Sequence, residues 1–123
     1  MQRILNDPDN IVDEMLQGFV KTHSDIIETT DNPRVIRAKG MKEGKVAVVT
    51  GGGSGHKPAF VGYVGEGMCD AAAVGEICSS TTAAAFLDAF KATDQGQGVA
   101  CLYGNYSGDN MNVKMAVKLA RSE

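Results

Sequence analysis

The stretch that decides the fold of this chain is Val46-Ala-Val-Val-Thr-Gly-Gly-Gly-Ser-Gly-His-Lys-Pro58. A short β-branched run leads into three consecutive glycines, then a serine, a fourth glycine, a histidine and a proline. This order predicts a strand followed by a loop whose backbone N–H groups come close to a small polar ligand. His56 lies at the rim of that loop, where an imidazole can donate a hydrogen bond or transfer a proton. A plain Gly-rich turn with a surface histidine is the alternative, but so many glycines cost more backbone entropy than a turn requires.

The spacing of this loop matches none of the common nucleotide-binding motifs. Counted from Gly51, the Walker pattern and the dinucleotide pattern both require a glycine at the position of His56. The Gly-x-Ser-x-Gly pattern, counted from Gly52, fails at the same residue. The sequence therefore does not support ATP or NAD binding in this segment. It favours a small ligand held by the backbone and His56.

Length, charge and cysteine usage limit the class of protein. The 123 residues suit one compact domain, and a formal net charge of -3 argues against a nucleic-acid partner. No apolar run reaches membrane-spanning length, and Met1 to Asp7 lack the hydrophobic core of a signal peptide. Cys69, Cys78 and Cys101 form no Cys-x-x-Cys pair, so neither a metal site nor a disulfide framework is expected. We expect a cytoplasmic protein.

Apolar periodicity along the rest of the chain predicts alternating strands and helices. The expected elements are a helix over 11–23 capped by Asp9 or Asn10, an edge strand over 34–38, a buried strand over 45–50, a short helix over 58–63, a buried strand over 69–74, a helix over 83–91 capped by Ser79 or Ser80, a strand over 99–103, and a last helix capped by Asp109 or Asn110 with Met111, Met115 and Leu119 on one face. This order predicts an α/β fold with a mostly parallel sheet flanked by helices.

Three polar, glycine-containing segments follow expected strands. They are residues 51–56, 75–80 and 104–109. Because ligands of parallel α/β sheets bind beyond the carboxyl ends of the strands, we expect these segments to meet around one site.

Asp109 is the candidate acidic group of that site. It follows Gly108 near an expected helix N-terminus, where the helix dipole favours an ionised carboxylate. Such a carboxylate can accept a proton from a bound hydroxyl or orient His56. A plain helix cap is the alternative. Asn105 and Tyr106 are further candidates for ligand contact, whereas His23 fits a surface position at a helix end.

In combination, these motifs resemble the substrate-binding subunit of dihydroxyacetone kinases. The resemblance is carried by residues 51–59, 62–68, 75–76 and 105–112, in that order, and it extends over nearly the whole chain. It implies a much longer intact protein with two α/β domains. Residues 1–123 would then be the N-terminal part of the substrate-binding domain, an incomplete first domain of that fold, with the remainder of the family's protein absent.

The family resemblance implies roles for individual residues. His56 matches the histidine that hydrogen-bonds the substrate and acts in acid–base catalysis, and Asp109 matches the aspartate that binds a substrate hydroxyl and acts as base. Gly53, Ser54 and Gly55 match the loop around the ligand, and Gly104 occupies a further substrate-contacting position. The substrate would be dihydroxyacetone or a related short ketose.

The resemblance also implies which groups and partners lie outside this chain. No cofactor is expected on the chain itself, because ATP or ADP with Mg²⁺ would be held by a separate nucleotide-binding domain or kinase subunit. A phosphocarrier of the phosphotransferase system is one possible phosphoryl source, and a homodimer is implied.

The sequence departs from the family pattern at three points. Lys57 replaces a usual glutamate. Gly104 replaces a lysine that many members have. The smaller residue leaves room for a longer ketose such as a tetrulose. Alternatively, it marks a non-catalytic dihydroxyacetone-binding paralogue that acts as a transcriptional co-activator. His23 and His56 are the only histidines, so the histidine that binds substrate covalently in the family is missing. We therefore predict that the chain alone does not turn over. A structural remnant without a ligand is the remaining alternative.

Overall fold

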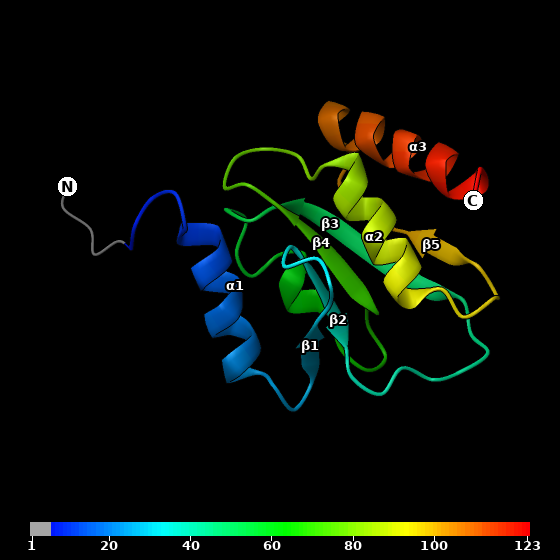
Figure 1. Ribbon diagram of the computed structural model, residues 1–123, viewed down its shortest axis with the longest axis horizontal. Coiled ribbons are helices and arrows are strands. Elements are labelled where there is room, and N and C mark those ends of the chain that lie inside the picture. The colour runs from blue at the N-terminus through cyan, green and yellow to red at the C-terminus, as the bar shows by residue number, and fades with distance from the viewer. Residues whose placement is uncertain (1–5) are drawn as a thin grey trace.

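The computed structural model describes residues 6–123, so most of the segment compared with a signal peptide lies outside the described residues. Figure 1 shows a central sheet with helices on both sides. The elements are α1 (Ile11–Thr22), β1 (Ile27–Thr29), β2 (Val35–Ala38), β3 (Ala47–Gly53), the 3-10 turn η1 (Val61–Tyr63), β4 (Ala71–Gly75), α2 (Ala83–Thr93), β5 (Val99–Cys101) and α3 (Ser107–Arg121).

The five strands lie in the order β1-β2-β4-β3-β5. Strand β3 pairs in parallel with both β4 and β5, whereas β2 pairs antiparallel with β4 and β1 pairs antiparallel with β2. The predicted α/β class is confirmed, but the sheet is mixed where a mostly parallel one was expected, since two of its four strand pairings are antiparallel. The prediction that residues 34–38 form an edge strand is wrong, because the short strand β1 covers that edge. Both Val35 and Ile36 are fully buried, so β2 is covered on both faces.

Alternating side chains of the strands point into two separate cores. Val35, Val49 and Ala73 pack against α2 and α3. Ile36 and Ala72, which alternate with them along the strands, pack against α1 and η1. Figure 1 shows the same arrangement, with α1 on one side of the strands and α2 and α3 on the other. The result is a three-layer packing in which the apolar face of α1 docks on the sheet.

Strand β3 continues through the glycines that were expected to form a loop. Gly51 pairs with Ala73 and Gly53 pairs with Gly75. A Cβ atom on Gly51 would lie 2.6 Å from the carbonyl oxygen of Ala73 and 2.6 Å from the Phe86 ring. These glycines therefore allow the neighbouring backbone and side chains to approach closely, and the loop itself begins at Ser54.

Most predicted elements are present, with shifted boundaries. The strand expected over 45–50 spans 47–53, that over 69–74 spans 71–75, and that over 99–103 ends at Cys101. The helix expected over 83–91 continues to Thr93. The helix expected over 58–63 is only the short 3-10 turn η1.

The residues that cap α2 and α3 differ from the predicted ones. Helix α2 is capped by Thr82, whose hydroxyl accepts a hydrogen bond from the Ala85 N–H at 3.1 Å, and not by Ser79 or Ser80. Helix α3 begins at Ser107, so Asp109 lies inside its first turn instead of capping it. Asn10 occupies the cap position of α1, but its side chain makes no capping hydrogen bond.

The face of α3 that contacts the core is not the one carrying Met111 and Met115. Both methionines are at least half exposed, whereas Val113 and Ala116 are buried against α2. A helix packed on one side only leaves its opposite side open, and the open side of α3 carries Met111, Met115 and Leu119 together with Lys114 and Lys118. Within residues 6–123, no helix combines the length and the apolar character of a transmembrane span.

Candidate functional site

The three glycine-containing segments meet at the carboxyl ends of β3, β4 and β5, as predicted. Between them lies an open cavity of about 670 Å³. Its lining residues come from the end of β3 and the segment after it, the segment after β4, the segment after β5 and the first turn of α3; they are Gly53, Gly55, His56, Ala59, Phe60, Ile77, Cys78, Ser79, Ser80, Gly104, Asn105, Tyr106 and Asp109. We call this space the candidate cavity. It contains both residues that were predicted to carry the chemistry.

Asp109 contributes a buried carboxylate to the candidate cavity. It is the third residue of α3, and only 6% of its surface is exposed. Its Oδ1 atom is buried and has no hydrogen-bond partner among the described residues. The N-terminal end of a helix favours a negative charge at this place. A buried carboxylate oxygen without a donor is unfavourable, and a ligand hydroxyl in the cavity would supply that donor.

His56 reaches the same cavity from the loop after β3 and is exposed. Its ring meets Phe60 edge-on, with ring centroids 5.9 Å apart and an interplanar angle of 86°. Phe60 has a φ of 67°, a conformation that few residues other than glycine adopt. That backbone conformation places the Phe60 ring against Gly52, where a Cβ atom would overlap it. Gly52 and Phe60 together form the support behind the imidazole.

The loop after β3 is held by its neighbour through backbone hydrogen bonds. The N–H of Ser54 donates to the Glu76 carbonyl at 3.0 Å, and the N–H of Gly55 donates to the Ile77 carbonyl at 2.9 Å. A Cβ atom on Gly53 would lie 3.1 Å from the Ser79 carbonyl oxygen. The glycines thus serve the close packing of two loops, and these two N–H groups are already engaged within the protein.

The predicted site residues are not all in the cavity lining. Gly53, Gly55, His56, Gly104 and Asp109 line it, as the predicted convergence requires. Ser54 does not. Its side chain is buried, and its Oγ has no hydrogen-bond partner among residues 6–123.

Several lining residues were not predicted. Phe60, Ile77 and Cys78 all contribute side chains to the cavity. The sequence signal for Ile77 and Cys78 was their position directly after Gly75-Glu76 in a segment already assigned to the site. For Phe60, the signal was absent, because an apolar residue in an expected helix is usually part of a core.

Side-chain hydrogen bonds attach the third segment to α3. The Tyr103 hydroxyl donates to Asn110 Oδ1 at 3.0 Å, and Asn110 Nδ2 donates to Asn105 Oδ1 at 2.9 Å. Asn112 Nδ2 donates to the Thr81 carbonyl at 2.7 Å, which ties α3 to the start of α2. These contacts hold the first turn of α3, and with it Asp109, against the other two loops.

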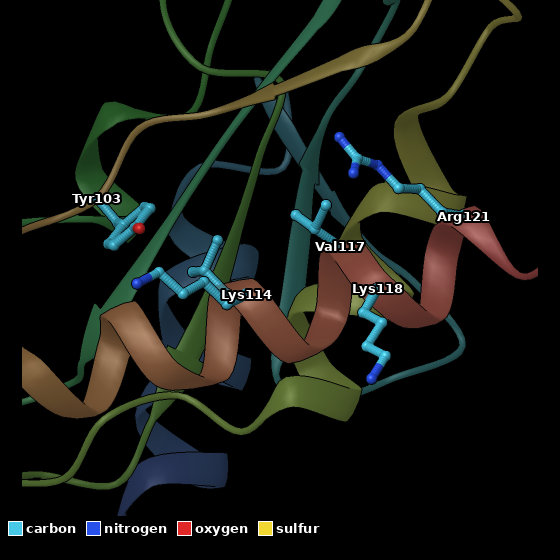
Figure 2. Close-up of a pocket in the computed structure, with 6 residues that line it drawn as sticks. Tyr103, Lys114, Val117, Lys118 and Arg121 are labelled. Atoms are coloured by element: carbon cyan, nitrogen blue, oxygen red, sulfur yellow. The ribbon is translucent and has the colours of Figure 1, made fainter.

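A separate cavity of about 420 Å³ lies along α3 and contains none of the predicted site residues. Figure 2 shows Tyr103 on one side of it and the side chains of Lys114, Val117, Lys118 and Arg121 projecting from α3. Its cationic side chains are exposed, and among the described residues no buried polar side-chain atom without a partner belongs to its lining. The candidate cavity therefore remains the place where chemistry is expected.

The three cysteines are free and differ in their predicted reactivity. Burial, with a smaller effect of Cys69, raises the pKa of Cys101 to about 11, and burial followed by the charge of Asp70 raises the pKa of Cys69. Because the thiolate is the nucleophile, both should react slowly at pH 8, and Cys101 should become more reactive as the pH rises toward 11. Exposed Cys78 should be alkylated first by iodoacetamide, as mass spectrometry of peptides would show. Unfolding in urea should abolish the difference, and equal rates in the folded protein would contradict the prediction.

The chain has an open α/β sheet with a cavity at the carboxyl ends of its parallel strands, which is the place where this class of α/β domain commonly binds small ligands. Among domains of this class, residues 17–123 match the sequence model of the Dak1 domain. The chain belongs to the Dak1 domain family.

Curated relatives carry kinase names. The chain is 45% identical over 123 residues to the dihydroxyacetone-binding subunit DhaK of PTS-dependent dihydroxyacetone kinase 1 from Listeria innocua, covering 100% of the chain and 37% of that protein. It is 43% identical to the D-erythrulose kinase of Mycolicibacterium smegmatis, covering 100% of the chain and 21% of that protein. The chain thus spans little more than a third of the first of these relatives and about a fifth of the second.

Solved structures of the same kind superimpose on the fold. The dihydroxyacetone kinase from C. freundii, solved in complex with AMP-PNP and Mg²⁺, matches with a TM-score of 0.90 at 30% identity, covering 98% of the chain and 23% of that structure. The dihydroxyacetone kinase operon co-activator Dha-DhaQ matches with a TM-score of 0.83 at 33% identity, covering 89% of the chain and 34% of that structure.

Proposed function

We propose that residues 1–123 form the N-terminal part of the substrate-binding domain of a dihydroxyacetone kinase, and that they bind a short ketose and present it for phosphorylation. The observation that carries this proposal is the buried Asp109 carboxylate, which lies in the same cavity as His56 and whose Oδ1 has no donor among residues 6–123. A small molecule with several hydroxyl groups supplies the donor that this oxygen needs. The kinase names of the relatives support the choice of a ketose.

In the proposed reaction, Asp109 and His56 act on hydroxyl groups of the bound ketose. The Asp109 carboxylate accepts a hydrogen bond from the hydroxyl to be phosphorylated and takes its proton as the oxygen attacks the phosphoryl group. His56 donates a hydrogen bond to, or exchanges a proton with, a neighbouring ketose oxygen. Gly53, Gly55 and Gly104 carry no side chains, so the ligand can approach the backbone closely.

We assign the nucleotide and its Mg²⁺ to a separate domain or subunit. The N–H groups of Ser54 and Gly55 donate to carbonyls of the neighbouring loop, so this loop offers no free row of amides for phosphates. Among the described residues, no group of three or more His, Cys, Asp or Glu side chains is arranged to hold a metal ion. ATP would supply the phosphoryl group, or ADP would relay it, while bound to that separate domain or subunit. We also propose that the complete substrate-binding subunit is a homodimer.

The substrate class we favour includes four-carbon as well as three-carbon ketoses. A Cβ atom on Gly104 would meet no atom within 4 Å, so this side of the candidate cavity is open. The 43% identical relative is named a D-erythrulose kinase, and erythrulose is a four-carbon ketose. Extra length of the substrate would be accommodated beside Gly104.

Titration of the ¹⁵N-labelled chain with dihydroxyacetone and with erythrulose tests the binding step. We expect shifts in the amide signals of residues 53–56 and 104–109, with erythrulose binding at least as tightly as dihydroxyacetone. Substituting Asp109→Asn should weaken binding about tenfold, since a charged acceptor is lost. Asp25→Asn, which removes an exposed carboxylate elsewhere, is the matched control and should bind like the unchanged chain. Shifts confined to other residues would contradict the proposed site.

A second candidate function is favoured by one observation. The co-activator structure Dha-DhaQ shares the fold at a TM-score of 0.83. Under this second candidate function, the chain belongs to a non-catalytic paralogue that binds dihydroxyacetone and acts as a transcriptional co-activator. The presence of both His56 and Asp109 in the candidate cavity favours the enzyme, because ligand binding alone does not require an acid–base pair.

A further inference from the structure

Arg34, outside the candidate cavity, connects three parts of the molecule. Its Nε donates to Asp13 Oδ1 of α1 at 2.7 Å, and its Nη2 donates to Glu76 Oε1 at 2.8 Å. Its Nη1 also donates to the Gly75 carbonyl at 3.4 Å. The Arg34 side chain is only 22% exposed, so it lies largely within this cluster.

Two of the groups that Arg34 contacts, the Gly75 carbonyl and the Glu76 carboxylate, lie next to residues that form a wall of the candidate cavity. Gly75 and Glu76 come directly before Ile77 and Cys78, which line the cavity. The Glu76 and Ile77 carbonyls accept the N–H groups of Ser54 and Gly55. The position of the segment after β4 therefore determines the position of the segment that carries His56.

We propose that Arg34 is a positioning residue for the ligand site: it holds Gly75 and Glu76 in place, and through them the loop from Ser54 to His56. The inference rests on the proposed function, because it assigns Arg34 a role in binding the ketose without touching it. It also gives α1 a part in the site, since Asp13 fixes the other side of the guanidinium and lies before the residues that match the Dak1 domain.

The geometry requires an arginine. A guanidinium presents N–H groups in a planar fork and can donate to two carboxylates and a carbonyl at once. A lysine ammonium is a single point charge at the end of a flexible stem and would favour one carboxylate over the other. Charge alone is therefore not sufficient for the role.

The chain offers a matched control on strand β2, which begins directly after Arg34. Arg37 pairs with Glu28 at 3.0 Å and donates to the Ala92 carbonyl at 3.0 Å, so it also holds a carboxylate and a backbone oxygen. Neither group belongs to the candidate cavity. Arg34→Gln and Arg37→Gln thus remove comparable interactions, one connected to the site and one not.

The experiment compares amide hydrogen exchange and ligand affinity in these two variants of the full 123-residue chain. Arg34→Gln should speed exchange at the Ser54 and Gly55 amides about tenfold relative to Arg37→Gln and weaken dihydroxyacetone binding about fivefold, because a local anchor of these loops is lost. Arg34→Lys should show smaller changes in exchange rate and in dihydroxyacetone affinity than Arg34→Gln, but it should not reach the values of the unchanged chain. Equal exchange and affinity in the two glutamine variants would overturn the inference.

A milder variant covers the case in which Arg34→Gln does not fold. Glu76→Gln keeps the size of the side chain and removes one charged partner of Arg34, and it should speed exchange at Ser54 and Gly55 in the same direction. An unchanged rate at these amides would overturn the inference. If the unchanged chain shows no ketose binding, the proposed function fails, while the exchange comparison still decides whether Arg34 positions the loop.

Discussion

Asp109→Asn is expected to lower ketose phosphorylation by about 10²- to 10⁴-fold, the range that follows loss of a general base. The asparagine keeps the shape of the side chain but cannot take the proton of the substrate hydroxyl. The measurement requires a complete subunit, since we predict no turnover by the chain alone, whose histidines are only His23 and His56. A suitable protein joins residues 1–123 to the remainder of the 45% identical Listeria innocua subunit, supplied with a phosphoryl-donor subunit.

The stability of the same variant separates a functional role from a structural one. The Oδ1 atom of Asp109 is buried and has no donor in the part of the chain that the structure describes, so replacing the charge with a neutral amide should leave the melting temperature unchanged or raise it. Asp25→Asn serves as the control for charge and should retain full activity. A large fall in melting temperature with unchanged phosphorylation would show that Asp109 is a structural residue of α3 and not a base.

Gly51→Ala is expected to have the largest effect on stability, lowering the free energy of unfolding by about 3 kcal/mol. The added methyl group would lie 2.6 Å from the backbone oxygen of Ala73 and 2.6 Å from the ring of Phe86. Neither can move easily, because Ala73 is in the middle of β4 and Phe86 is fully buried. Thermal unfolding followed by circular dichroism should show a fall in melting temperature of about 10 °C.

Gly18→Ala provides the matched control for this substitution. Gly18 lies within α1, and a Cβ atom there would meet nothing within 4 Å. Alanine is the better helix former, so the free energy of unfolding should rise by about 0.5–1 kcal/mol. A Gly51→Ala protein as stable as the Gly18→Ala protein would show that the close packing around Gly51 does not limit stability.

The local sequence was a good guide wherever a long apolar pattern was present. Apolar periodicity predicted helices over 11–23 and 83–91, which are α1 and α2, and both pack on the sheet. The β-branched run before Gly51 predicted β3, and the polar segments after the strands predicted the place of the cavity. Each of these features depends on residues close to one another in the chain.

Errors occurred where a neighbour distant in the sequence decides the structure. The strand β1 has only three residues, so it shows too little alternation to be detected, and its pairing with β2 made the edge-strand prediction wrong. The cap of α2 depended on which of several hydroxyl residues meets the first turn, and Thr82 does so. Met111, Met115 and Leu119 share one face of α3, as predicted, but the contact with α2 decides that a different face of the helix is buried.

The sequence by itself determined the α/β class, the order of most elements and the identity of the two groups expected to do chemistry, because these depend on short-range patterns and residue types. Only the tertiary structure decided why the glycines are needed and how His56 and Asp109 come to share a cavity. Gly51 and Gly52 make room for Phe86 and Phe60, and the loop after β3 is held by carbonyls of the loop after β4. The approach of Gly51 to Phe86 and the hydrogen bonds between the two loops join parts of the chain more than twenty residues apart, and no local pattern encodes them.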